Sequence, residues 1–139
     1  MRVVLDTNVL VAAVRSRHGA SFQVLSLVGT DEFEVAVSVP LVLEYEDAML
    51  RHLPATSLSE AEICDIIDYI CSVALRQDIF FLWRPQLRDP GDDLVLELAV
   101  AAGCEAIVTH NVRDFGGARD FRVRVLSPGL FLNELRSQK

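Results

Sequence analysis

Short apolar runs alternate along this chain with longer segments in which apolar and polar residues recur at helical spacing. The short runs are rich in β-branched residues and carry little internal charge, which is typical of strands buried in a parallel sheet. They predict strands over residues 2–6, 33–38, 105–110 and 122–126, and an additional strand or extended segment over "IFFLW" at 79–83.

The longer segments predict helices with recognisable start signals. Ser38 is expected to cap a helix over about 40–52. Ser59 and Glu62 form a capping-box pattern, which predicts a helix that runs to about Arg76. Further helices are expected over 8–14, over 20–28, from the "DPGDD" turn at 89–93 to Gly103, and over 128–136.

Strands that alternate with helices predict an α/β fold, in which helices on both faces cover a central parallel sheet through right-handed crossovers. The chain has 139 residues, which is enough for one domain with a sizeable core and too few for two of ordinary size. We therefore expect a single domain over residues 1–139.

The overall composition excludes some classes of protein. The net charge of −7 argues against a protein that coats nucleic acid through excess basic charge. Charged residues interrupt every apolar stretch before it reaches the length of a membrane span, and no export signal is visible, so we expect no membrane association. The three cysteines lack the spacing of a zinc site; they suggest reduced thiols in a cytoplasmic protein, with Cys64 and Cys71 packed in the core.

Acidic side chains gather at one end of the predicted sheet. Asp6 ends the first strand, Glu44 lies in the first turns of the helix after the second strand, and Asp92 and Asp93 open the helix before "EAIVTH". Ligand sites of open parallel sheets form beyond the carboxyl ends of the strands, so these groups can converge on one edge. Each acid also has an ordinary structural interpretation, as a helix cap, a partner of the helix dipole or a solvated surface charge.

Four motifs occur together in order: "LDTNVL", "LVLEYEDAMLR", "DPGDDLVLELAVAAG" and "AIVTHNVRDF". Together they resemble the PIN domain, in particular the prokaryotic PIN toxins of the VapC type, over nearly the whole chain. The resemblance implies a three-layer α/β/α domain with a central parallel sheet. It also implies a ribonuclease that uses Mg²⁺ or Mn²⁺, an RNA substrate and an antitoxin protein as partner, and it is compatible with a homodimer.

Carried over to this chain, the resemblance makes Asp6, Glu44 and Asp92 the first three acids. Asp92 is preferred because the acid of the family lies eleven residues before the glycine that closes this helix, and Asp93 stays the alternative. Where many relatives have "T-x-D", this chain has Asn111, which leaves Asp114 as the fourth carboxylate and Asn111 as a neutral oxygen donor. The expected supporting residues are Thr7, Asn8, Thr109 and Asn111.

The residue chemistry agrees with a hard cation. Carboxylate oxygens suit Mg²⁺ and Mn²⁺, whereas His18, His52 and His110 are scattered and form no zinc site with the cysteines. Two metal ions would assist the attack of water on a phosphodiester bond. Four arginines are candidates for RNA contacts, with solvated surface charge as the alternative: Arg113, Arg119, Arg122 and Arg124.

Other functions fit less well. A phosphatase with an aspartyl nucleophile needs a second acid where this chain has Asn8. A receiver domain needs a lysine late in the fold, and the only lysine here is the terminal Lys139. Structured DNA is disfavoured as a substrate because so short a chain lacks added domains. The remaining alternative is a PIN-like fold without turnover, which would bind RNA or protein.

Overall fold

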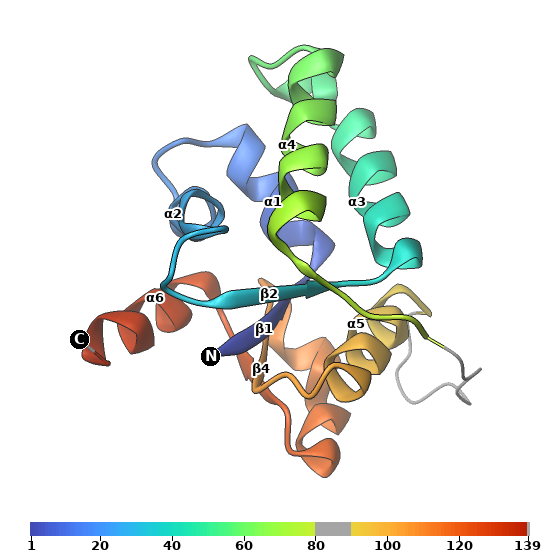
Figure 1. The fold of residues 1–139 in the computed structure, drawn as a ribbon. Coiled ribbons are helices and arrows are strands. Elements are labelled where there is room, and N and C mark those ends of the chain that lie inside the picture. Colours follow the sequence, from blue (N-terminus) through green and yellow to red (C-terminus); the bar gives the residue numbers. More distant parts are fainter. Residues whose placement is uncertain (80–89, 139) are drawn as a thin grey trace.

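A five-stranded parallel sheet forms the centre of the computed structural model, which describes residues 1–79 and 90–138 (Figure 1). The strand order is β3-β2-β1-β4-β5, and Val3 of the central strand pairs with Val35 on one side and Ala106 on the other. This confirms the predicted α/β class. The strands are β1 (Arg2–Leu5), β2 (Glu34–Val37), β3 (Leu75–Arg76), β4 (Ala106–Val108) and β5 (Arg124–Leu126).

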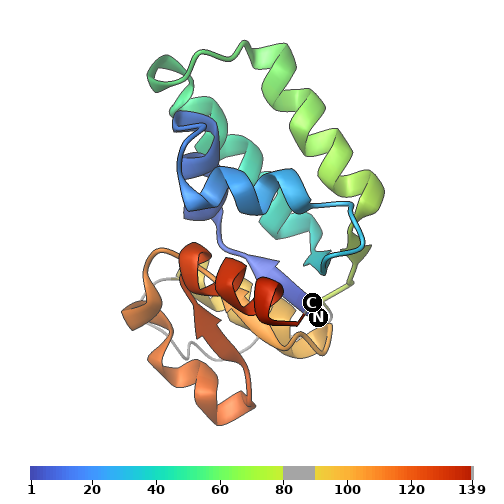
Figure 2. The ribbon, with the colours of Figure 1, turned by 90° about the vertical axis from the view of Figure 1, so that its left-hand side faces the viewer.

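Helices cover both faces of the sheet and complete three layers (Figure 2). One layer holds α1 (Thr7–Arg15), α2 (Ala20–Leu27), α3 (Val39–Arg51), the short η1 (Leu53–Ala55) and α4 (Glu60–Val73). The opposite layer holds α5 (Pro90–Ala101) and the 3₁₀ segment η2 (Val112–Phe121). The C-terminal helix is α6 (Pro128–Ser137). The last helix packs against both β5 and α2. This arrangement confirms the α/β/α architecture.

The predicted caps determine where two of these helices begin. The Ser38 hydroxyl accepts a hydrogen bond from the amide of Leu41 at 3.3 Å and caps α3. Ser59 and Glu62 form a complete capping box at the start of α4, each accepting from the other's main-chain amide. Such caps satisfy amides that have no partner inside the helix, so they fix the chain at the edge of the sheet.

The predicted extension of α4 to Arg76 is wrong. The helix ends at Val73, and Leu75 and Arg76 form β3 beside Ala36 and Val37 of β2. The free hydrogen-bonding edge of β2 offers these two residues main-chain partners that a longer helix would leave unused. The predicted strand at 79–83 lies outside the described residues except for Ile79, which has no regular structure.

The predicted core position of Cys64 is also wrong. The buried face of α4 is formed by Ile63, Ile67 and Ile70, and Cys64 lies one residue beyond it, exposed to solvent. Cys71 is half-buried and Cys104 is buried, and all three thiols are free, as predicted. Adjacent helical positions point about 100° apart, so an apolar stripe at Ile63 does not include its neighbour.

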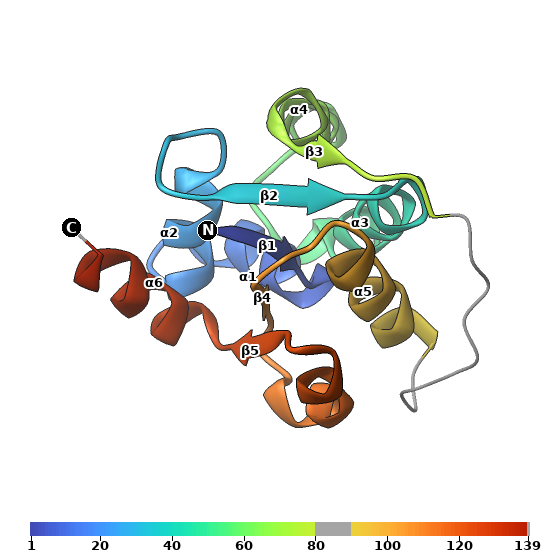
Figure 3. The same cartoon turned by 60° about the horizontal axis from the view of Figure 1, so that its bottom comes forward.

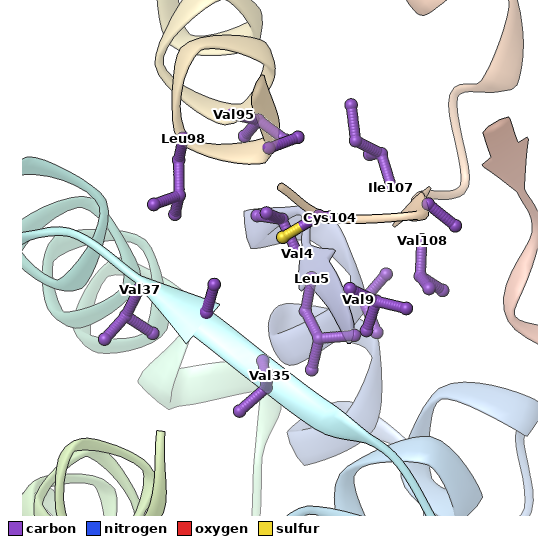
Figure 4. Close-up of a cluster of buried hydrophobic side chains, with 14 of the residues drawn as sticks. Val4, Leu5, Val9, Val35, Val37, Val95, Leu98, Cys104, Ile107 and Val108 are labelled. Atoms are coloured by element: carbon purple, nitrogen blue, oxygen red, sulfur yellow. The ribbon is translucent and has the colours of Figure 1, made fainter. Parts of the chain in front are cut away.

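The core lies on both sides of the central strands (Figure 4). Val4 and Leu5 of β1 are fully or almost fully buried, and they share this cluster with Val9 of α1 and with Val95 and Leu98 of α5. Burying each such side chain contributes roughly 1.5–3 kcal/mol. Because β1 is enclosed in this way, the residue that follows it has a fixed position.

Among residues 1–79 and 90–138, no helix is both long and apolar enough to span a membrane.

Candidate active site at the carboxyl end of the sheet

The order of the strands creates a natural site between β1 and β4. From β1 the chain adds β2 and then β3 on one side, and it later returns to add β4 and β5 on the other side. Neighbouring crossovers therefore diverge at the carboxyl ends of β1 and β4, where open parallel sheets bind ligands. The arrowheads of β1 and β2 point to the side of the molecule on which α3 and α5 begin (Figure 3).

Asp6 lies at the carboxyl end of β1, where the crossovers diverge, and its carboxylate is held from both sides. Its side chain is 7 % exposed. One carboxylate oxygen accepts a hydrogen bond from the Thr109 hydroxyl at 2.7 Å, and the other accepts from the Thr7 amide at 2.8 Å. The amide of Asp6 itself donates to the Val108 carbonyl at 2.9 Å. The first acid is thus anchored to the residues that end β4.

Asp6 also caps α1, so the structural interpretation of this acid is correct, and its role as a metal ligand stays a prediction. Ordinary capping side chains bind the second or third amide of the helix. Here the amide of Val9 donates to the main-chain carbonyl of Asp6 at 3.0 Å, and the carboxylate accepts from the first amide, that of Thr7. Capping therefore occupies one carboxylate oxygen, while the other joins two strands.

Thr109 connects the surrounding polar side chains. It is completely buried, and its hydroxyl oxygen accepts from the Asn111 amide at 3.0 Å and lies 3.3 Å from the donating side-chain nitrogen of Asn8. The side-chain oxygen of Asn8 accepts from the His110 amide at 3.2 Å. Each of the four predicted supporting residues therefore takes part in a hydrogen bond with Asp6 or with Thr109: Thr7, Asn8, Thr109 and Asn111.

Glu44 lies in α3, directly before a residue that contacts the end of β1. Its neighbour Tyr45 is buried and donates a hydrogen bond to the carbonyl of Leu5 at 2.5 Å. Burial raises the pKa of Tyr45 well above its ordinary value, and the negative charges of Asp6 and Glu44 raise it further. The negative charges of Asp6 and Glu44, which come from different parts of the chain, thus act on the same hydroxyl group.

The first turn of α5 adds two more acids. Asp92 is half-buried and Asp93 is 8 % exposed. Burial, and after it the charge of Asp93, raises the pKa of Glu97 one turn later. The helix packs against β1, β4 and α3, the elements that carry or precede the other acids.

Asp114 is placed differently from the other acids. It lies in η2, its side chain is exposed, and its main-chain amide donates to the Asn111 carbonyl at 3.0 Å. Over the described ranges, its carboxylate makes no hydrogen bond or ion pair. The structure therefore puts Asp114 on the segment that leaves Thr109, at the surface.

The donor set suits a hard divalent cation. No group of three or more His, Cys, Asp or Glu side chains within residues 1–79 and 90–138 is arranged to hold a metal ion. Mg²⁺ is usually held by one or two carboxylates, together with waters and substrate phosphate, so a pair such as Asp6 and Glu44 fits it. The Thr7 hydroxyl beside Asp6 is buried without a hydrogen-bond partner in this part of the chain, as expected where a water or an ion completes a polar site.

Three further residues contribute to this region, and the sequence gives little or no signal for them. In the sequence, Tyr45 resembles any other apolar position of a helix, yet its hydroxyl contacts the end of β1. Glu97 is separated from Asp93 by one helical turn, and that spacing is the available signal. The Ser21 hydroxyl lies 2.6 Å from a ring nitrogen of His110, a contact across 89 residues that no local pattern indicates.

Comparison with known proteins agrees with this geometry. The model of a family described as "PIN domain" matches residues 2–113, which is most of the chain. This chain belongs to the PIN domain family. PIN domains are generally nucleases and typically depend on divalent metal ions. None of the curated proteins compared with it matches.

A solved structure shares the fold of this PIN domain. It is described as VapBC2 from Rickettsia felis, bound to a DNA fragment from their promoter, and it is 17 % identical in sequence with a TM-score of 0.60. The alignment covers 91 % of this chain and 98 % of the other. The two chains therefore have the same architecture over nearly their whole lengths.

Proposed function

We propose that this PIN domain is a metal-dependent endoribonuclease and the toxin of a toxin–antitoxin pair. The observation that carries the proposal is the Asp6 carboxylate, which is buried at the carboxyl end of β1 and bonded to Thr109, while the charges of Asp6 and Glu44 both raise the pKa of Tyr45. Buried acids gathered in this way repel one another, and a bound cation removes that repulsion. The similarity to a VapBC2 structure supports the toxin assignment.

Some residues of the site would bind the cation, and others orient those ligands. Asp6, Glu44 and Asp92 would bind Mg²⁺ or Mn²⁺, with Asp93 as the alternative to Asp92 and Asp114 reaching in from η2. Such a cation supplies a polarised water for the attack on phosphorus and positive charge for the leaving oxygen. Thr109 and the Thr7 amide orient the Asp6 carboxylate, and Asn8 orients Thr109.

The proposed substrate is single-stranded RNA. Exposed arginines of η2 and the segment after it lie beside the residues that follow β4, and guanidinium groups bind phosphate in a bidentate way. These side chains would attract RNA locally although the whole chain is acidic. Attack of water on a phosphodiester bond then gives endonucleolytic cleavage.

The proposed partner is an antitoxin that covers the acidic site. An Arg or Lys of the antitoxin would lie among the carboxylates, where it would replace the cation as the balancing charge. A peptide of that kind should therefore inhibit cleavage in competition with Mg²⁺. A homodimer is a further part of the proposal, and light scattering of the purified chain tests it.

The direct test is RNA cleavage at a series of Mg²⁺ and Mn²⁺ concentrations. We expect endonucleolytic products that increase with metal concentration and disappear in EDTA. Cleavage that is undiminished in EDTA would overturn the metal-dependent mechanism. RNA binding without cleavage at any metal concentration would instead favour a PIN domain that has lost turnover and serves as a binding module.

A further inference from the structure

A hollow of about 460 Å³ lies between η2 and β5, outside the group of acids. Its volume falls in the range of small-ligand sites, about 300–1,000 Å³. Three of its nine lining residues are arginines in a chain whose net charge is −7. The lining consists of Val112, Phe115, Gly116, Arg119, Arg122, Val123, Arg124, Val125 and Leu126.

One end of the hollow meets the candidate active site. Leu126 lines the hollow, and its carbonyl accepts a hydrogen bond from the Thr109 amide at 2.9 Å. Val112, another lining residue, directly follows Asn111, whose amide donates to the Thr109 hydroxyl. A molecule in the hollow would thus lie beside a residue that is hydrogen-bonded to Thr109, the threonine that holds Asp6.

The arginines of the hollow differ in how their charge is balanced. Arg124 pairs with Glu134 of α6, and this contact lowers the pKa of the Glu134 carboxyl. Arg119 and Arg122 have no ion pair in the part of the chain that the structure describes. Two exposed guanidinium groups therefore have their donors available for an anion.

The backbone holds these two arginines together. Arg122 adopts a left-handed conformation with φ of 61°, the only non-glycine residue with positive φ in the described ranges. Its amide donates to the Arg119 carbonyl at 3.0 Å, so one turn carries both guanidinium groups at the start of β5. Non-glycine residues in this conformation are uncommon, and they cluster at ligand sites.

We infer that the hollow binds the sugar-phosphate backbone of single-stranded RNA next to the bond that is cut. Phosphate would contact Arg119 and Arg122, and the sugar or base would lie on the apolar side chains of Val112 and Val125. The inference rests on the proposed function and adds a second contact region to it. An acidic segment of a protein partner would also pair with these arginines. Binding of such a segment, however, would not require the hollow to adjoin Thr109 and the candidate active site.

The main test combines Arg119→Ala and Arg122→Ala in one variant. The matched control combines Arg51→Ala and Arg136→Ala, two exposed arginines near the ends of α3 and α6, so both variants lose the same net charge. The substrates are a dinucleotide that spans only the cut bond and a single-stranded RNA long enough to reach the hollow. We expect KM for the long RNA to rise about tenfold in the test variant and to change little in the control.

Two further readouts identify phosphate contacts. The KM for the dinucleotide, which does not reach the hollow, should rise less in the test variant than the KM for the long RNA. The dependence of the long-RNA Kd on salt, measured by fluorescence anisotropy, should weaken in the test variant. Its logarithmic slope should fall by about 1.4, which corresponds to two lost phosphate contacts with a single strand.

A second variant adds bulk at a lining residue of the hollow without changing charge. A Cβ added at Gly116 meets no atom within 4 Å, so Gly116→Phe should fold with a large side chain at the hollow. Gly19→Phe, at an equally open glycine before α2, is the control. Gly116→Phe should weaken binding of the long RNA, and Gly19→Phe should not.

The outcomes separate this inference from the proposed function. Failure of the unmodified chain to cleave the long RNA at any Mg²⁺ or Mn²⁺ concentration would count against the proposed nuclease, while the binding measurements would still test the hollow. Unchanged Kd and salt slope in both hollow variants would overturn the inference. Loss of binding to an acidic protein partner, with RNA binding intact, would overturn it too and assign the hollow to that partner.

Discussion

The Thr109 hydroxyl donates a 2.7 Å hydrogen bond to the Asp6 carboxylate and so joins two residues that lie 103 positions apart in the sequence. Both are buried, and each ends one of two neighbouring strands. Hydrogen bonds from a threonine to a carboxylate are stronger than neutral ones, because the acceptor carries a full charge. This pair therefore fixes the direction in which the Asp6 carboxylate faces the site.

Replacing Thr109 by Val should harm both stability and activity. Valine keeps the shape of the side chain but removes the hydroxyl that Asp6, Asn8 and the Asn111 amide share. Loss of a buried hydrogen-bond partner costs about 1–3 kcal/mol in the free energy of unfolding, measured by urea denaturation. Loss of support for a metal ligand should also lower cleavage about 10–100-fold. Thr109→Ser, which keeps the hydroxyl, is the control, and equal activity in the two variants would contradict the role of this bond.

Replacing Asp6 by Asn should separate capping from metal binding. Asparagine caps a helix about as well as aspartate, and it removes one negative charge close to Glu44. The metal-free variant should keep its fold and melt at the same temperature or higher, but it should lose most cleavage and most stabilisation by Mg²⁺. Melting curves with and without Mg²⁺, together with an RNA cleavage assay, give all three readouts. Retained activity with unchanged metal-induced stabilisation would mean that Asp6 is only a cap.

The two acids at the start of α5 should behave differently when each is changed to asparagine. Asp92→Asn should lose most cleavage, because we assign the third metal ligand to Asp92. Asp93→Asn should mainly lower the pKa of Glu97 toward its ordinary value, because it removes the charge that helps to raise it. NMR titration of the Glu97 carboxyl measures that change. Loss of cleavage in Asp93→Asn alone would transfer the ligand assignment to Asp93.

The buried thiol of Cys104 should make the fold sensitive to alkaline pH. Burial raises the pKa of Cys104 from 9.0 to about 11, so the folded chain keeps the proton that the unfolded chain releases first. The contribution of Cys104 is complete below pH 9 and is lost as the pH rises toward 11. Urea denaturation over this range should therefore show a weaker loss of stability in Cys104→Ala. Cys71→Ala, at a half-buried thiol, is the control, and identical pH profiles in all three proteins would contradict the prediction.

Local patterns explain why most of the fold could be predicted. Apolar runs such as that of β1 and caps such as Ser38 and Ser59 act over a few residues, so their effects can be read directly from the chain. The end of α4 could not be predicted, because Leu75 and Arg76 become a strand only when the edge of β2 is beside them. That competition between helix and sheet depends on tertiary contacts.

The sequence predicts which residues belong to the candidate site, but not how they contact one another. The sequence places Asp6, Glu44 and Asp92 at helix starts that share one end of the sheet, since strand ends in a parallel sheet share an edge. It does not indicate the Tyr45 contact with Leu5 or the link between Ser21 and His110, because these contacts form between elements distant in sequence. The metal roles of the acids stay predictions that the variants above can test.

The central position of β1 has a consequence for synthesis of the chain on the ribosome. Strand β1 lies between β2 and β4, and β4 is made about a hundred residues after it. At translation rates of about 5–20 residues per second, Asp6 waits roughly 5–20 s before Thr109 exists to bind it. A nascent chain therefore carries Asp6 without the partner that orients it, and the proposed nuclease cannot be assembled until Thr109 has been translated.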